Sequence, residues 1–326
     1  MSTTVLFLGG AGMIGSAAAA EAHARGYEVT IITRSEPTRP IPAGVRQLRG
    51  DVRDAGQLSA LVGDERFDAV VNWIGYDTGH LESHAELFRR VTSHYVFIST
   101  CSVFARPVPL LPITESSARR QSVFGYARGK LECEEYLEAA YRHDDLPVTI
   151  VRPFHTYDKA TIPVLSGWTA IERMRAGKGV IVHGDGTSPW SLMHSSDFAR
   201  AFVPLLGNQQ TIGESVNVVS GDILTWDSIH TTLGMAAGVP EPALVHRASE
   251  SIATEWPGWG EVLEHDFRHA MVFDTSKLRR LVPDFAPRVS FSVGAREIIE
   301  HYERNPQLQR VDPELDAAFD RLVARP

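Results

Sequence analysis

Tyr126 and Lys130 are the two side chains whose types and spacing best suit acid–base chemistry. They stand four residues apart in a segment, 124–132, that predicts the start of a helix running to about Arg142, so both share one face of that helix. A phenol alone has a pKa near ~10 and is a weak base at neutral pH, but an ammonium a few ångströms away lowers that pKa. A tyrosine so tuned takes a proton from an alcohol or returns one to a carbonyl. The same spacing occurs on ordinary helices, so a catalytic role depends on what surrounds the pair.

The chain opens with glycines at the spacing of a nucleotide-binding turn. An apolar run over 4–8 predicts a strand, and the alanines of 17–20 favour a helix. A strand that enters a helix through such a turn begins a dinucleotide-binding βαβ unit. Glycine permits positive φ and a close approach to pyrophosphate, and the helix start offers unpaired N–H groups. An ordinary glycine-rich turn is the alternative. We predict cofactor contacts along this loop, with the last glycine allowing tight packing of helix on strand: Gly9, Gly12, Met13, Ile14 and Gly15.

The end of the second predicted strand, 26–34, bears on the choice of cofactor. Thr33 and Arg34 end it, and no carboxylate follows until Glu36. An acidic residue at this place binds the 2′-hydroxyl of NAD, whereas an arginine accommodates the 2′-phosphate of NADP. The sequence therefore favours NADP and keeps NAD as the second choice, with a solvated loop arginine as the alternative interpretation.

Two further strands are expected to end beside the cofactor. The third, 45–48, is followed by Asp51 and Val52, where the carboxylate can accept from the adenine amino group or cap the next helix. The fourth, 68–76, leads through Ile74 into a glycine turn. Both ends belong to the sheet edge at which open α/β folds bind ligands.

Hydroxyl groups gather at the end of the fifth predicted strand, 95–104. We predict that Thr100 holds the substrate oxygen in line with Tyr126, and that Lys130 also bonds the nicotinamide ribose. The cofactor then supplies the hydride, and the protein supplies geometry and charge. Cys101 is interpreted as a packing residue rather than a nucleophile, because no histidine adjoins it. Candidate substrate contacts nearby are Tyr76, Cys101 and Ser102.

Composition restricts the kind of protein. The chain has 326 residues, of which 43% are hydrophobic and 22% charged, with a net charge of −8. These values are typical of a globular protein, and the acidic balance disfavours nucleic acid as a partner. No stretch is long and apolar enough to cross a bilayer, and the two cysteines favour a reducing cytoplasm over a disulfide framework. His80 and His84 lack a third ligand in the sequence nearby, so we expect surface histidines and no metal.

The alternation of strands and helices breaks down after the sixth predicted strand, 147–153, although 214–219 is expected to return to the sheet. We predict an α/β fold, a Rossmann-like doubly wound parallel sheet with a smaller C-terminal substrate-binding domain. Residues 1–157 and about 184–222 are assigned to the dinucleotide-binding domain, and about 158–183 and 223–326 to a substrate-binding lid.

Taken together, the chain resembles the extended short-chain dehydrogenase/reductases, the NAD-dependent epimerase/dehydratase family. The resemblance rests on the glycine loop, on the tyrosine–lysine pair, and on 99–104, which is similar to the family's Ser-Ser/Thr-x-x-Val-Tyr segment. Residues 184–187 and 193–197 are similar to its late substrate-domain signature. The resemblance implies that Thr100 is catalytic and that Pro153 flanks the nicotinamide.

His155 and Trp190 depart from the pattern of family members that act on sugar nucleotides. An asparagine and an arginine that bind the diphosphate usually stand at these positions, so both residues become candidate substrate contacts, with simple packing as the alternative. Cys101 and Ser102 replace the Asp-Glu of the dehydratase branch, which disfavours dehydration. The end of the second strand also resembles the atypical branch that contains chloroplast stem-loop RNA-binding proteins.

We therefore expect an NAD(P)-dependent epimerase or oxidoreductase that acts on a secondary alcohol of a sugar, sugar nucleotide or nucleoside-like substrate through a keto intermediate. An NADPH-dependent ketone reductase is the alternative, and a nucleotide-gated RNA-binding or regulatory protein is the alternative of another class. The expected partner is a small-molecule substrate, with no membrane, and a homodimer stays open.

Overall fold

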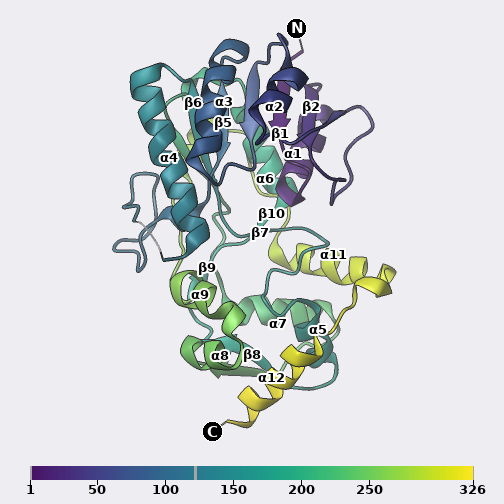
Figure 1. Cartoon of the computed structure of the whole chain (residues 1–326). Helices are drawn as coiled ribbons and strands as arrows, with labels where there is room; N and C mark the ends of the chain where they lie inside the picture. The colour runs from purple at the N-terminus through teal and green to yellow at the C-terminus, as the bar shows by residue number, and fades with distance from the viewer. Residues whose placement is uncertain (1, 121–122, 326) are drawn as a thin grey trace.

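Seven parallel strands form the central sheet of the protein. The computed structural model describes residues 2–120 and 123–325, and the strands lie in the order β11-β6-β5-β4-β1-β2-β3 (Figure 1). The order reverses between β1 and β4, the point at which doubly wound sheets bind ligands. The predicted fold class is confirmed, and so is the return of 214–219 to the sheet beside β6. The bounds are β1 Thr4–Leu8, β2 Glu28–Thr33, β3 Arg46–Arg49, β4 Ala69–Asn72, β5 Tyr95–Ile98, β6 Val148–Pro153 and β11 Ser215–Val218.

Helices cover both faces of the sheet, which is why its inner strands are apolar on both sides. One face packs against α1 (Met13–Ala24) and α6 (Ser195–Phe202), and the alanines of α1 let these two helices approach closely. The other face is covered by α2 (Ala55–Val62), α3 (Thr78–Val91) and α4 (Gly125–Asp144). Alternate side chains of β1 enter the two cores, as the period of a strand requires.

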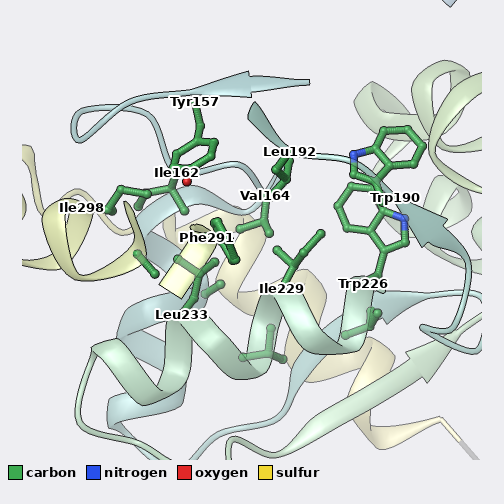
Figure 2. Packing of buried hydrophobic residues seen from close by; sticks show 14 of the residues in the cluster. Tyr157, Ile162, Val164, Trp190, Leu192, Trp226, Ile229, Leu233, Phe291 and Ile298 are labelled. Atoms are coloured by element: carbon green, nitrogen blue, oxygen red, sulfur yellow. The ribbon is translucent and has the colours of Figure 1, made fainter. Parts of the chain in front are cut away.

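A second body of helices lies beyond the carboxyl ends of the strands (Figure 1). Its own core joins aromatic and aliphatic side chains from segments far apart in the sequence; Figure 2 shows the indoles of Trp190 and Trp226 side by side at its upper edge. A parallel pair of strands, β8 and β13, is part of it. The elements are α5 Gly167–Arg175, β8 Val180–His183, α7 Trp226–Ala236, β13 Leu244–Arg247, α8 Ser249–Glu255, α9 Gly260–Val262, α11 Phe291–Arg304 and α12 Pro313–Ala324.

Short strand pairs join the two bodies. β7 (Thr156–Tyr157) pairs with β10 (Met193–His194), and β9 (Pro189–Trp190) pairs with β12 (Leu224–Thr225). The helix α10 (Ser276–Leu281), although late in the chain, packs through Leu278 in the same core as α1 and α6. The division of the chain into two domains remains a proposal.

Two local predictions were wrong. The fifth strand stops at Ile98 instead of continuing to residue 104, because Thr100 caps a 3₁₀ turn over Cys101–Val103 by accepting from the Ser102 N–H. His84 is buried rather than exposed; its ring bonds the Val52 carbonyl and the Asn72 side chain. The polar residues of 115–123 also predict a connecting segment, of which residues 121 and 122 lie outside those that the structure describes.

None of the helices in the described parts of the chain combines the length and the apolar character that crossing a bilayer would need.

Candidate active site

The glycine loop after β1 builds a cradle that only glycine fits. Gly9 and Gly10 have φ of +80° and +85°, and a Cβ on Gly9 would lie 2.6 Å from an Ile74 side-chain carbon. A Cβ on Gly15 would lie 2.4 Å from the backbone of Gly10, so this glycine permits the close contact between helix and loop. By contrast, a Cβ on Gly12 meets nothing within 4 Å, because Gly12 borders open space.

That open space is a cavity of about 380 Å³ at the switch point of the sheet. The first turn of α1 has no side-chain cap and no acidic residue, so its N–H groups are free to bind an anion. Glycine backbone, a helix start and polar groups along one wall suit a dinucleotide. Of the predicted cofactor contacts, seven line the cavity: Gly9, Gly12, Thr33, Arg34, Asp51, Val52 and Ile74. The other five do not line it: Met13, Ile14, Gly15, Lys130 and Pro153, the last of which ends β6 and is buried.

Two guanidinium groups stand at the far wall of this cavity. Arg53 binds the Asp51 carboxylate through Nε at 3.0 Å and Nη2 at 2.8 Å, and Arg34 Nη1 lies 3.5 Å from the same group. Asp54, not Asp51, caps the following helix. The Asp51 carboxylate is therefore paired with two cations. Sequence reasoning missed Arg53, although its position directly after Asp51 and Val52 was a usable signal.

Lys130 is turned away from the role expected of it. Its ammonium donates to the Ile98 carbonyl at 2.7 Å and lies 4.2 Å from the centre of the Tyr76 ring, and only 2% of the residue is exposed. Burial lowers the pKa of Lys130 to about 8. Gly129 lets this arrangement form, since a Cβ there would come within 3.0 Å of the Tyr76 carbonyl oxygen.

Tyr126 carries a proton in this environment. Although 43% of the residue is exposed, desolvation of its hydroxyl raises the pKa of Tyr126 to about 12, and a hydrogen bond with Thr100 only partly opposes that rise. The expected lowering of its pKa by Lys130 is therefore wrong, because the ammonium bonds a strand carbonyl instead. At neutral pH Tyr126 is a phenol, which donates a proton.

A second cavity, of about 300 Å³, opens beside Tyr126 and Thr100. Its wall includes His155, whose Nδ1 accepts from Trp190 Nε1 at 2.9 Å. Burial lowers the pKa of His155 to about 4, so the ring is neutral at pH 7. Since Nδ1 accepts, the single proton of the neutral ring lies on Nε2, which is a donor. His155 and Trp190, two of the predicted substrate contacts, thus line the cavity as a hydrogen-bonded pair. Tyr76, another of them, lines the first cavity instead.

Asp266 also lines this cavity, although no local pattern in the sequence predicted that it would. It comes from a π-helical turn, Leu263–Phe267, and accepts from Ser102 Oγ at 3.1 Å and from Arg106 Nη2 at 2.8 Å. The contact spans 164 residues. Ser102 is therefore at the cavity, as predicted for a substrate contact.

Cys101 lines neither of the two cavities, so the prediction that it contacts the substrate was wrong. It is fully buried, its thiol donates to the Arg152 carbonyl at 3.4 Å, and burial raises its pKa well above the ordinary value. The 3₁₀ turn after Thr100 directs it into the core. This position agrees with the prediction that Cys101 is a packing residue and not a nucleophile.

Glu134 of α4 and Arg152 of β6 form a buried ion pair. Glu134 lies one turn after Lys130 on α4 and accepts from Arg152 Nε at 2.8 Å and Nη2 at 2.7 Å, and from Arg119 Nη1 at 2.7 Å. Both partners are almost inaccessible to solvent. The pair connects α4 to β6, and no local pattern in the sequence indicates it.

In the described parts of the chain, no three histidine, cysteine or acidic side chains gather as a metal site would require.

Known proteins share this arrangement in different degrees. The sequence model of the NAD dependent epimerase/dehydratase family matches residues 5–219. The 2′-dehydrokanamycin reductase of Streptomyces kanamyceticus is 26% identical over 293 residues, which cover 87% of this chain and 80% of the reductase. The chloroplast stem-loop binding protein of 41 kDa b of Arabidopsis thaliana is 26% identical over 255 residues, covering 74% of this chain and 65% of that protein. The structure of UDP-glucose 4-epimerase from Bifidobacterium longum, in complex with NAD+ and UDP, superposes with a TM-score of 0.72 at 20% identity, covering 93% of this chain and 99% of the epimerase.

Proposed function

Because the chain belongs to the NAD-dependent epimerase/dehydratase family of enzymes, we propose that it interconverts a ketone and a secondary alcohol of a saccharide, working in the direction of ketone reduction. The observation that carries this proposal is Tyr126 as a protonated phenol, next to Thr100 at the edge of a cavity of substrate size. A ketone that accepts a hydride needs a proton donor at its oxygen. The relative named 2′-dehydrokanamycin reductase, whose name describes reduction of a saccharide ketone, supports the same direction.

The roles of the side chains follow from their positions. Thr100 and Tyr126 hold the carbonyl oxygen between two hydroxyl groups. The nicotinamide, when bound, supplies a hydride to the carbonyl carbon. Tyr126 gives its proton to the oxygen as the C–O double bond becomes single, which leaves a secondary alcohol and a tyrosinate that solvent reprotonates. Lys130 would reach the ribose or that tyrosinate only if its ammonium left the Ile98 carbonyl that holds it in this structure.

NADP is the cofactor that we propose within this NAD-dependent family. The glycine loop and the start of α1 would bind the pyrophosphate, and Arg34 and Arg53 would bind the 2′-phosphate. Because Asp51 is already bound by both guanidinium groups, it repels an added phosphate less than a free carboxylate would. The partners that we propose are a small-molecule substrate and, as before, a second copy of the chain in a homodimer.

The experiment is a set of single-turnover assays of purified enzyme with NADPH and saccharide ketones, 2′-dehydrokanamycin among them, following loss of the reduced nicotinamide absorbance. Tyr126→Phe is expected to slow hydride transfer by at least ~10²-fold with cofactor affinity unchanged. Tyr141→Phe is the matched control: it removes a phenol hydroxyl from an exposed position of the same helix, in neither cavity, so its rate stays near that of the wild type.

Two outcomes would overturn the assignment in different ways. An equal rate of hydride transfer for wild type and Tyr126→Phe would exclude Tyr126 as the proton donor. Inversion of a saccharide alcohol by enzyme with bound cofactor and no added NADPH would instead identify an epimerase, in which the hydride returns to the opposite face of the ketone.

A nucleotide-gated RNA-binding function is the second candidate, because one relative is named as a stem-loop binding protein. The net charge of −8 and the intact pair of Tyr126 and Lys130 count against it. Salt-sensitive binding of a stem-loop RNA that survives Tyr126→Phe, without turnover of any saccharide ketone, would favour it.

A further inference from the structure

We infer that Asp266 selects the substrate, and that the second cavity takes a saccharide or cyclitol that carries a protonated amino group and no phosphate. The inference rests on the proposed function, since it assigns the substrate class of the same site. It is argued from the charges, donors and acceptors that face the cavity.

Among the described residues, Asp266 brings the carboxylate to the lining of the cavity, and Arg106, the cation that pairs with it, is not part of that lining. Among the described residues that line it, Asp266 is acidic and none is a lysine or arginine, while His155 is neutral at pH 7. A nucleoside diphosphate would bring negative charge toward the free lone pairs of this carboxylate, and the lining would offer the phosphates no guanidinium or ammonium of their own. An ammonium group would bring the opposite charge. The electrostatics of the cavity therefore favour an amine over a phosphate.

Arg106, the nearest cation to Asp266, stands behind the carboxylate. Its side chain is 8% exposed, and its guanidinium donates to Asp266 Oδ1 at 2.8 Å and to the Phe104 carbonyl at 2.8 Å. Ser102 Oγ occupies one acceptor site on Oδ2 at 3.1 Å. Each carboxylate oxygen has a second lone-pair direction, so Asp266 retains acceptor capacity toward the cavity. Arg106 and Ser102 thus fix the carboxylate in place, and a charged donor on the substrate completes its hydrogen bonding.

The other walls suit a sugar-like ring. Phe154, Trp190 and Phe267 offer aromatic faces to its C–H groups. The Nε2–H of His155 offers a donor to a hydroxyl, since Nδ1 is engaged by the Trp190 indole. Together with Asp266 these groups specify a ring that is apolar on one face and has both hydroxyl and amino groups at its rim.

The test compares ligands that differ only in charge. Calorimetric titration of NADP+-loaded enzyme uses kanamycin A, its fully N-acetylated form and UDP-glucose as probes. We expect kanamycin A to bind at least ~10-fold more tightly than the acetylated form, because a hydrogen bond between charged groups contributes about 1.5–3 kcal/mol. Measurable binding of UDP-glucose that exceeds that of kanamycin A, equal binding of the two kanamycin forms, or no binding of kanamycin A at millimolar concentration would each overturn the inference.

Variants locate the effect on one carboxylate. Asp266→Asn is expected to weaken kanamycin A binding by at least ~10-fold and to leave the acetylated form unchanged. Glu264→Gln removes the same charge from the same π-helical turn at an exposed position and is expected to change neither. If the Asp266→Asn variant does not fold, the comparison of the three ligands on the wild-type enzyme still tests the preference for an amine. Failure of the proposed function is distinguishable, because it is the absence of hydride transfer, whereas this test measures binding alone.

Discussion

Replacing Glu134 by glutamine should destabilise the protein far more than the same change one turn later on the same helix. Glu134 is completely buried and accepts three charged hydrogen bonds, two from Arg152 and one from Arg119. The neutral amide leaves the Arg152 guanidinium buried without a counter-charge. Glu138, which pairs with Arg119 at a site where 27% of its side chain is exposed, is the matched control.

The magnitude follows from these burials. Breaking a buried ion pair by removing one partner costs about 3–5 kcal/mol, because the remaining charge stays desolvated. A pair that keeps partial contact with solvent, such as that of Glu138, contributes about 1 kcal/mol. With an unfolding entropy of about 2.1 cal/mol/K per residue, 3–5 kcal/mol lowers the Tm of a chain of this length by roughly 4–7 °C.

The assay is urea and thermal unfolding of wild type, Glu134→Gln and Glu138→Gln, followed by circular dichroism. The double variant Glu134→Leu with Arg152→Met removes both charges and is expected to be more stable than Glu134→Gln alone. If Glu134→Gln and Glu138→Gln differ by less than 1 kcal/mol, the assignment of a desolvated pair that fixes the catalytic helix is refuted.

Three further predictions concern the cofactor cavity and the buried histidines. Arg34→Ala should weaken NADPH binding about 10-fold or more and NADH binding little, because only NADPH brings a phosphate to this wall; equal losses in fluorescence titration would contradict the preference. Gly15→Ala should abolish tight cofactor binding, since its Cβ would overlap the Gly10 backbone at 2.4 Å; an unchanged Kd would show that the loop adapts. The free energy of unfolding should fall as pH drops from 6.5 to 4, because histidines of the unfolded chain bind protons that the buried histidines of the folded chain exclude. The expected loss at pH 5 is roughly 2 kcal/mol for each histidine. A Tm that stays constant from pH 7 to 5 would contradict this prediction. The histidines, whose pKa burial lowers to about 4, are His94, His155 and His183.

Local chemistry made the first half of the fold predictable. Apolar runs ended by glycine identify strands, because glycine alone tolerates the positive φ that Gly9 and Gly10 adopt. The alternation of such strands with helical segments predicts a parallel sheet, and the structure has a parallel sheet of seven strands. The pair of Tyr126 and Lys130 was identified by its helical spacing, which depends only on residues within one turn.

Where strands end was less predictable, since it depends on side-chain bonds. Continuous strand-forming residues after Ile98 suggested a longer strand, yet the Thr100 hydroxyl captures the Ser102 N–H and turns the chain. That turn directs Cys101 into the core and Ser102 toward the substrate cavity. A single side-chain hydrogen bond thus decided which neighbour could touch a ligand.

The sequence by itself determined the parallel sheet, the glycine cradle and the shared helix of Tyr126 and Lys130, because backbone sterics and helical period act between residues that are close in the chain. Only the tertiary structure decided the state of that pair and the character of the substrate cavity. The protonated Tyr126, the Lys130 ammonium held by a strand carbonyl, and the contact of Asp266 with Ser102 all depend on burial and on groups that folding brings together. Desolvation and charge pairing are properties of the packed interior, and no spacing along the chain encodes them.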